Sequence, residues 1–433
     1  MTFLKIGQTG DLRMQMANTS TSQRKIIFAA VFGNLLEFYD FTVYSYFALA
    51  ISKQFFPSHD AVTSTLLAFS AFAIGFVARP LGGLILGYYA DRKGRRSALS
   101  LTIMLMALGA AMIGLAPNYA TIGVAAPALI VLARVIQGFA QGGEFGAATA
   151  TLLETGSDAS RGFRASWQLA SQGAAALLGA GVATTLTFSL STEALNDWGW
   201  RIPFLLGTLI VPVGIYLRRH IVDEPQEAKP KGSRLFETRH VINWFLTVFS
   251  IMGMSVSSYI MIYYLPTYSI QQLGLPEKLS IMVALATSVI SFVMCPIYGA
   301  WSDKLRKRKP LAIIGRLMLL VLLYPAFWVM THFPNLPAVM SAMIVLMVFY
   351  TMGSAPAYAL MPESFPRRIR ASYMASAYAV AVSVFGGTAQ LVAAWLIDAT
   401  GSKMAPAWYM IACVLISLLA ISFFEETGDK ALE

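Results

Sequence analysis

Charged residues are scarce in this chain of 433 residues: Asp, Glu, Lys and Arg together make up 12% of it, while hydrophobic residues make up 57%. The mean hydropathy is +0.62. A chain of this composition cannot hide its apolar surface inside a water-soluble core. The scarcity of charge therefore excludes an ordinary soluble domain and indicates a protein whose solvent is the lipid bilayer.

Cysteine and histidine are also rare. Cys295 and Cys413 both lie inside apolar runs, where we expect them to pack as small hydrophobic residues without a disulfide between them. The four histidines fall in loops or at the expected ends of helices: His59, His220, His240 and His332. None is placed to relay protons through the middle of a membrane, and we expect no metal site.

Motifs of enzymes and of ATP-driven pumps are absent from the sequence. It contains neither G-x-x-x-x-G-K-[ST], the loop that cradles phosphates, nor G-x-S-x-G, the turn that presents a nucleophilic serine. No loop is long enough to hold a nucleotide-binding domain. The sequence therefore indicates that the protein is not an enzyme, and we expect no cofactor.

Long apolar runs dominate what is present. A helix needs about 20 apolar residues to cross about 30 Å of hydrocarbon, and these runs do not alternate apolar and polar residues as barrel strands do. Twelve runs qualify: 26–50, 62–88, 97–116, 121–150, 165–190, 202–218, 240–266, 279–300, 310–331, 338–360, 371–397 and 406–424. The sequence predicts an all-α polytopic membrane protein with twelve transmembrane helices.

The basic residues are distributed unevenly between the loops. If the N-terminus is cytoplasmic, four of the 32 Lys and Arg fall in outer loops, namely Lys53, Arg201, Lys278 and Lys403. This imbalance follows the positive-inside rule and places both termini in the cytoplasm. The net charge of +10 thus reports topology in an inner membrane rather than a nucleic-acid partner. The N-terminal segment shows no removable signal peptide.

Two motifs repeat at nearly the same offset. Gly87 and Asp91 recur as Gly299 and Asp303, and Glu154 and Arg161 recur as Glu363 and Arg370. Repeats of this kind predict two six-helix halves in the same orientation, with the binding site between them. We place the halves at 26–218 and 240–424, joined by a cytoplasmic linker at 219–239 and flanked by cytoplasmic tails at 1–25 and 425–433.

Several stretches resemble a known family. The loop GYYADRKGRR (87–96) resembles the signature that transporters of the major facilitator superfamily carry between their second and third helices. Five stretches resemble the metabolite:proton symporter subfamily of that superfamily. They are GNLLEFYDFTVYSYFA (33–48), FVARPLGGLILGYYADRKGRR (76–96), RVIQGFAQGGEFG (134–146), WGWRIPFLLG (198–207) and ESFPRRIRAS (363–372). The resemblance implies a major facilitator fold, a monomer, and proton symport of citrate, α-ketoglutarate, shikimate, or proline and betaine.

Charged residues inside the runs concentrate in the first half. Glu37 and Asp40 share one face of the first run, Arg79 lies in the second and Arg134 in the fourth. Each would cost about 2.5–3.5 kcal/mol if it faced lipid. We expect Glu144 to pair with basic loop residues. We expect Arg316, near the start of the ninth run, to extend its side chain toward the cytoplasmic surface.

Because no histidine is available, a carboxylate must carry any coupled proton. Burial favours the neutral carboxyl group and a nearby arginine favours the ionised one, so pairing and releasing that arginine makes a proton switch. We favour Asp40 as the proton carrier with Arg134 as its partner, which agrees with the resemblance. Glu37 is the rival carrier, and both acids acting as static counter-ions between helices is the third interpretation.

Substrate binding is expected from arginines and from uncharged polar residues. The guanidinium fork of Arg79 or Arg134 matches a carboxylate in two parallel hydrogen bonds, although Arg79 could equally be a packing residue. The uncharged candidates lie on four of the runs: Tyr44, Gln168, Gln172, Tyr259, Tyr263 and Gln390.

The repeated motifs supply the candidate gating residues. In the resembling superfamily, contacts of this loop close the cytoplasmic side when the outer side is open. The candidates are Asp91, Arg92, Arg95, Glu154, Arg161, Asp303, Glu363 and Arg370. We expect the arginines of the first loop to pair with Glu154 or with the loop of the other half; holding the loop inside is the simpler alternative.

Four functions remain in competition. The leading prediction is a secondary active transporter that imports a small organic anion with protons by alternating access; sodium is the alternative coupling ion. A zwitterion such as betaine or proline is the second cargo, although the short segment after the last run favours the anion. An efflux antiporter is disfavoured because 170–185 lacks a proline. A sensor that transports nothing is disfavoured because no signalling domain is present.

Overall fold

The computed structural model describes residues 28, 31–93, 95–142, 145–208 and 237–432, and every regular element among them is helical. The first half contains the first helix (31–46), α2 (Ala48–Phe55), α3 (Ala61–Val77), α4 (Arg79–Lys93), α5 (Arg95–Leu115), α6 (Tyr119–Ile122), α7 (Ala125–Gln141), α8 (Phe145–Glu154), α9 (Arg161–Ser189), α10 (Thr192–Asp197) and a helix described over 202–208. The N-terminal tail expected at 1–25 and most of the linker expected at 219–239 lie outside the described part.

The second half begins at α12 (Thr238–Ser258) and continues without a gap. It contains the π-helical η3 (Tyr259–Tyr264), α13 (Leu265–Gln271), α14 (Glu277–Leu305), α15 (Lys309–His332), α16 (Leu336–Glu363), α17 (Arg367–Ala381), the π-helical η4 (Val382–Gly386), α18 (Ala389–Thr400) and α19 (Ala405–Phe423). Cys295 and Cys413 are both buried and free, as expected.

Eight helical segments of the described part are long and apolar enough to cross a membrane. They are Ala61–Leu86, Asp158–Ser189, Thr238–Gln271, Glu277–Leu305, Lys309–His332, Leu336–Glu363, Arg367–Thr400 and Ala405–Phe423, with shorter apolar helices at Ser100–Leu115 and Ala125–Gln141. The first and sixth expected runs, 26–50 and 202–218, extend outside the described residues. The all-helical class is confirmed, whereas the total of twelve stays a prediction.

Several expected runs are interrupted. The first is broken by a turn at Phe47, and the second divides at Ala78, two residues before Pro80, which lacks a backbone N–H and restricts the residue before it. The seventh and eleventh runs each contain a π-helical turn, at η3 and η4. Such turns often occur at functional sites because they redirect side chains within a helix.

Close contact between α3 and α7 positions the charged residues of the first half. A methyl group added at Gly138 would collide with the backbone carbonyl of Gly75, so these two helices touch through backbone atoms. Small residues allow this approach in membrane bundles. It brings Arg79, at the start of α4, and Arg134, on α7, to the same part of the interior.

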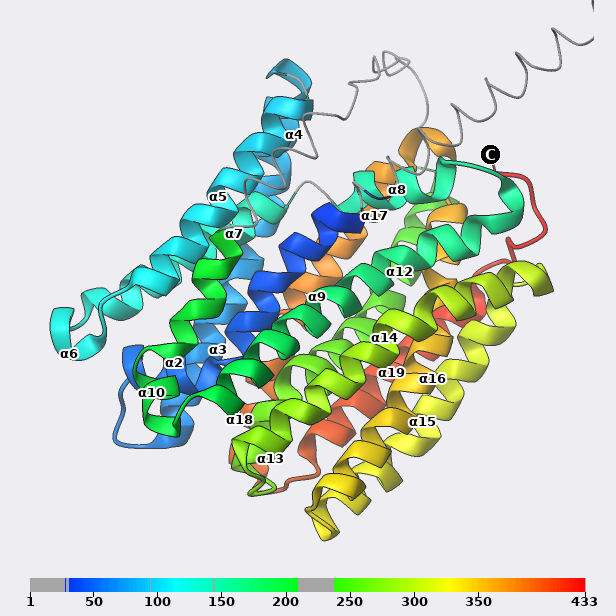
Figure 1. Ribbon diagram of the computed structural model, residues 1–433. Helices are drawn as coiled ribbons and strands as arrows, with labels where there is room; N and C mark the ends of the chain where they lie inside the picture. The colour runs from blue at the N-terminus through cyan, green and yellow to red at the C-terminus, as the bar shows by residue number, and fades with distance from the viewer. Residues whose placement is uncertain (1–27, 29–30, 94, 143–144, 209–236, 433) are drawn as a thin grey trace, which may run out of the picture.

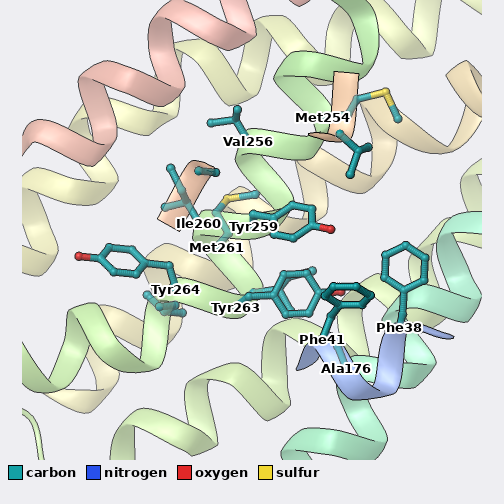
Figure 2. Packing of buried hydrophobic residues seen from close by; sticks show 14 of the residues in the cluster. Phe38, Phe41, Ala176, Met254, Val256, Tyr259, Ile260, Met261, Tyr263 and Tyr264 are labelled. Carbon is teal, nitrogen blue, oxygen red and sulfur yellow. The ribbon is translucent and has the colours of Figure 1, made fainter. Parts of the chain in front are cut away.

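The two halves meet along α9 and α14, which run side by side in Figure 1. A methyl group at Gly173 would meet the backbone of α14 at Phe292, so this contact is also close. Figure 2 shows part of the buried cluster to which Phe38 and Phe41 of the first helix and Tyr259 and Tyr263 of η3 all belong. This interior is where the charged residues of the first half meet the aromatic residues of the second.

Candidate functional site

Asp40 and Arg134 are joined through a third residue, Gln137. The Nε2 of Gln137 donates to Oδ2 of Asp40 at 3.1 Å, and its Oε1 accepts from Nη1 of Arg134 at 2.8 Å. Gln137 and Arg134 are fully buried and Asp40 is 5% exposed. The expected acid and arginine are therefore brought together, with a neutral amide between them.

A second glutamine holds Arg79 in the same manner. Oε1 of Gln141 accepts from Nη2 of Arg79 at 2.6 Å, and its Nε2 donates to the backbone carbonyl of Glu37 at 3.1 Å. Glu37 is itself buried on the first helix, three residues before Asp40. Both carboxylates and both arginines of the sequence prediction thus lie in one buried region of the first half.

Aromatic rings surround the two guanidinium groups. The ring of Phe41 lies 4.5 Å from the Cζ of Arg134 and 4.8 Å from that of Arg79. Arg134 also lies over Tyr44 and Phe72, at 4.7 and 4.9 Å. Cation–π attraction of this kind is worth about 2 kcal/mol or more when the ions are desolvated, so the rings partly replace water around the charges.

Several polar atoms of this region have no hydrogen-bond partner among the described residues. They are Oδ1 of Asp40, Nε of Arg79, and Nε and Nη2 of Arg134. A buried donor without an acceptor costs about 1–3 kcal/mol, more when it is charged. The two arginines therefore have the capacity to bind an anion, and Asp40 has a free oxygen for a proton.

The second half contributes an aromatic face opposite these charges. The ring of Tyr259 lies 5.7 Å from that of Phe76 and 5.1 Å from that of Tyr263. The hydroxyl groups of Tyr259 and Tyr263 are buried and have no partner in the described part of the chain. Both tyrosines thus lie at the boundary between the halves, and their role in binding substrate stays a prediction.

The other lining candidates are engaged in contacts between helices. The Tyr44 hydroxyl donates to the carbonyl of Ala68 at 2.9 Å, and Nε2 of Gln168 donates to Oδ1 of Asn34 at 3.1 Å. Nε2 of Gln390 donates to Ser45 across the boundary between the halves, at 2.9 Å.

Some of their polar atoms nevertheless lack partners in the described structure: Oε1 of Gln168, Oε1 of Gln390 and Nε2 of Gln172. Both helix packing and ligand binding are compatible with this arrangement.

A cluster of ion pairs joins the halves at one end of the bundle, which we call the charged end; its residues are Glu154, Arg161, Asp303, Arg308, Glu363 and Arg370. Arg370 of α17 contacts Glu154 of α8 at 2.6 Å, and Arg161 of α9 contacts Glu363 of α16 at 3.4 Å. Each repeated acid thus pairs with the arginine of the opposite half. The exchange is reciprocal, as expected for two halves related by internal symmetry.

Asp303 joins the halves through a helix terminus. Its two carboxylate oxygens accept from the backbone N–H groups of Gly162 and Phe163, at 2.9 and 2.8 Å. These are the first turn of α9, where a carboxylate is favoured by the positive end of the helix dipole. The structure thus places Asp303, one of the candidate gating residues, at the start of a helix in the other half. Arg308, which the sequence analysis missed, contacts it at 2.6 Å.

The first-half copy of this loop is only partly described. The side chains of Asp91 and Arg95 lie outside the description. Arg92 is exposed and its guanidinium lies 4.5 Å from the ring of Tyr88 on its own helix. Glu154 instead contacts Arg367 and Arg370 of the other half among the described side chains, so the expected pairing of the first-loop arginines with Glu154 or with the loop of the other half stays a prediction.

Two sets of residues were missed or misplaced by the sequence analysis. Gln137 and Gln141 lie three and seven residues after Arg134 on α7, a spacing that places all three on one face, and this signal was available. Arg316 does not extend toward the surface: it is 4% exposed and donates to Ser417, Gly353 and Ser250, on three other helices. Its acceptors are distant in sequence, so no local pattern reveals them. Glu144 lies outside the described residues.

Comparisons with known proteins agree with this architecture. The Major Facilitator Superfamily matches residues 30–381 and 282–431 of the chain. The citrate-proton symporter of Klebsiella pneumoniae is 33% identical over 438 residues, covering 99% of this chain and 98% of the relative. The proline/betaine transporter of Salmonella typhimurium is 31% identical over 427 residues, covering 95% and 85%.

Solved structures show the same fold at lower sequence identity. The xylose transporter XylE from E. coli, in a partially occluded inward-open conformation, is 19% identical with a TM-score of 0.77, covering 95% of this chain and 100% of that one. At this identity the likeness concerns the fold alone.

Proposed function

This chain belongs to the Major Facilitator Superfamily, and we propose that it is a proton-coupled symporter that imports a small organic anion. It is a multi-pass membrane transporter with the all-helical fold of that family, not an enzyme. The finer parts of the proposal are twelve spans in an inner membrane, both termini in the cytoplasm, a monomeric state, and no cofactor besides the proton gradient.

The observation that carries the proposal is the buried group Asp40–Gln137–Arg134 beside Arg79. It combines a carboxylate that can exchange a proton with two guanidinium groups that have unpartnered N–H donors. Because the group is closed off from water by aromatic rings, its electrostatic interactions are strong. A site with these properties suits the joint binding of a proton and a carboxylate.

The mechanism follows from charge balance. An anion entering between the halves binds Arg134 and Arg79, and a proton on Asp40 offsets the negative charge that the anion brings. Movement between outward-open and inward-open states then requires the contacts of the charged end to break and re-form. We assign that end to the cytoplasmic side, where the positive-inside rule puts basic loop residues. Glu37 is the second candidate carrier, and sodium the second coupling ion.

A zwitterion such as betaine is the second candidate cargo, favoured by the proline/betaine transporters among the relatives. A quaternary ammonium group binds on the faces of aromatic rings. Here the rings of Phe41, Tyr44 and Phe72 already contact Arg134, which leaves Tyr259 and Tyr263 of η3 for such a cation. The surplus of guanidinium donors is better matched by a carboxylate, and we therefore favour the anion.

The test is uptake into proteoliposomes under an imposed inward proton gradient. The panel contains labelled citrate, α-ketoglutarate, shikimate and betaine, with Asp40→Asn and Glu37→Gln beside the wild type. We expect gradient-driven uptake of one anion, lost in Asp40→Asn while counterflow exchange survives.

Three results would contradict parts of this expectation. Uptake of betaine alone would exclude the anion, and uptake that requires a sodium gradient would exclude the proton. Loss of driven uptake in Glu37→Gln but not in Asp40→Asn would identify Glu37 as the proton carrier.

A further inference from the structure

The face of α7 that meets the first helix carries two glutamines in matching positions. Gln137 and Gln141 are four residues apart, 0% and 4% exposed, and each accepts a hydrogen bond from an arginine and donates one to the first helix. They differ in one respect. Gln137 donates to the carboxylate of Asp40, whereas Gln141 donates to the backbone carbonyl of Glu37.

The orientation of the Gln137 amide is fixed by both of its neighbours. Arg134 has only N–H donors to offer, so it requires the amide oxygen, and an ionised Asp40 has only acceptors, so it requires the amide nitrogen. A reversed amide would place donors against donors and an oxygen against a carboxylate. The Nη1 group of Arg134 therefore stays hydrogen-bonded to Gln137 as long as Asp40 is ionised.

We propose that Gln137 is a positioning residue that couples the protonation of Asp40 to the binding of a substrate carboxylate by Arg134; this rests on the function proposed above. A proton on Asp40 converts the charge-assisted bond from Gln137 into a neutral one, which is roughly half as strong. The carboxylate of the substrate then displaces the weakened amide of Gln137 from Arg134. Gln141 holds Arg79 to a group that does not titrate, so it cannot transmit a proton.

The surroundings of Asp40 leave few other groups to carry this coupling. Among the described residues, Asp40 interacts electrostatically with Arg134 of α7 and with Tyr39 of its own helix, whose hydroxyl donates to the carbonyl of Pro203. Glu37 lies one turn before Asp40 on the same helix face. The helix at 202–208 contacts Asp40 through Gly207, which carries no side chain. Among the described residues, Gln137 is the one that bonds to both Asp40 and Arg134.

The matched pair of glutamines allows a controlled experiment. Gln137→Met and Gln141→Met each remove one amide of the same helix face while keeping its length. For each we would measure driven uptake, counterflow, and the KM of counterflow between pH 5.5 and 8.5. We expect Gln137→Met to lose about tenfold or more in driven uptake relative to counterflow and to flatten the dependence of KM on pH. Gln141→Met should lower both activities together and keep the wild-type pH profile.

The outcomes separate this proposal from the proposed function. If the wild type shows no gradient-driven uptake, the proposed function fails. If the wild type is coupled and Gln137→Met keeps the wild-type ratio and pH profile, or if both variants change them equally, the role of Gln137 is refuted.

A second pair of variants guards against misfolding. Gln137→Glu keeps an acceptor for Arg134 but replaces the amide donor to Asp40 with an acidic oxygen, and Gln141→Glu, which adds the same acidic group one turn away, is its control. Loss of coupling confined to Gln137→Glu supports the proposal, and coupling retained in Gln137→Glu overturns it.

Discussion

The contact of Asp303 with the start of α9 predicts how strongly the charged end is closed. Asp303 is 8% exposed at its side chain and accepts two backbone N–H bonds from the other half. Its bond to Arg308 lies within the second half and survives when the halves separate. Of the bonds that Asp303 makes, only the two to α9 therefore contribute to closure.

The substitution Asp303→Asn removes the charge and leaves one acceptor oxygen for two donors. A hydrogen bond to a charged group is worth about 1.5–3 kcal/mol, so losing one and weakening the other costs the closed state about 2–3 kcal/mol. That corresponds to a shift of roughly 30- to 150-fold in the equilibrium between closed and open forms at this end. A state that was rare becomes readily detectable.

The assay is the distance between spin labels at Ala159 and Lys307, two exposed positions on opposite halves, in a variant without the native cysteines. We expect a second, longer distance to appear in Asp303→Asn. The control is Asp158→Asn, whose side chain is 65% exposed and lies 4.0 Å from Arg161, because exposed pairs contribute little. Identical distance distributions in Asp303→Asn and the wild type would refute this reasoning.

Three further predictions concern packing and binding. Arg316→Leu leaves Ser417 and other buried acceptors without a donor, so we expect a loss of about 3 kcal/mol or more in stability, visible as a lower midpoint of thermal unfolding in detergent; an unchanged midpoint would contradict it. Gly138→Ala should prevent α7 from docking on α3 and abolish folded protein in size-exclusion chromatography, whereas Gly181→Ala, which meets no neighbouring atom, should fold normally. Arg134→Lys keeps the charge but loses the planar fork, so the KM of counterflow should rise about tenfold in protein that still folds; an unaltered KM would contradict a role of Arg134 in binding substrate.

Apolar runs predicted which parts of the chain are helical, but not where the helices end or bend. α14 continues to Leu305, past the end of its apolar run at 300, because hydropathy reports the hydrocarbon layer and a helix continues into water with polar residues. The turn at Phe47 and the π-helical turn of η3 lie inside continuous apolar runs, whose hydropathy does not mark them.

The charged residues of the site were predictable because charge inside an apolar run is costly and therefore conspicuous. The glutamines that connect them were overlooked although their spacing from Arg134 places them on its helix face, since an amide inside an apolar run is less conspicuous than a charge. The repeat predicted that Glu154 and Glu363 are equivalent, as are Arg161 and Arg370. It did not predict that the pairs exchange partners between halves, because that depends on how the halves dock.

The most direct test of the account is proton movement driven by the substrate alone. Proteoliposomes with a pH-sensitive dye inside would receive the substrate identified by the uptake panel, with no imposed gradient and with potassium and valinomycin to clamp the membrane potential. We predict that the interior acidifies with the wild type and that Asp40→Asn exchanges substrate without moving protons. Substrate entry into wild-type vesicles without acidification, or acidification that persists in Asp40→Asn, would contradict the claim that Asp40 carries the coupled proton.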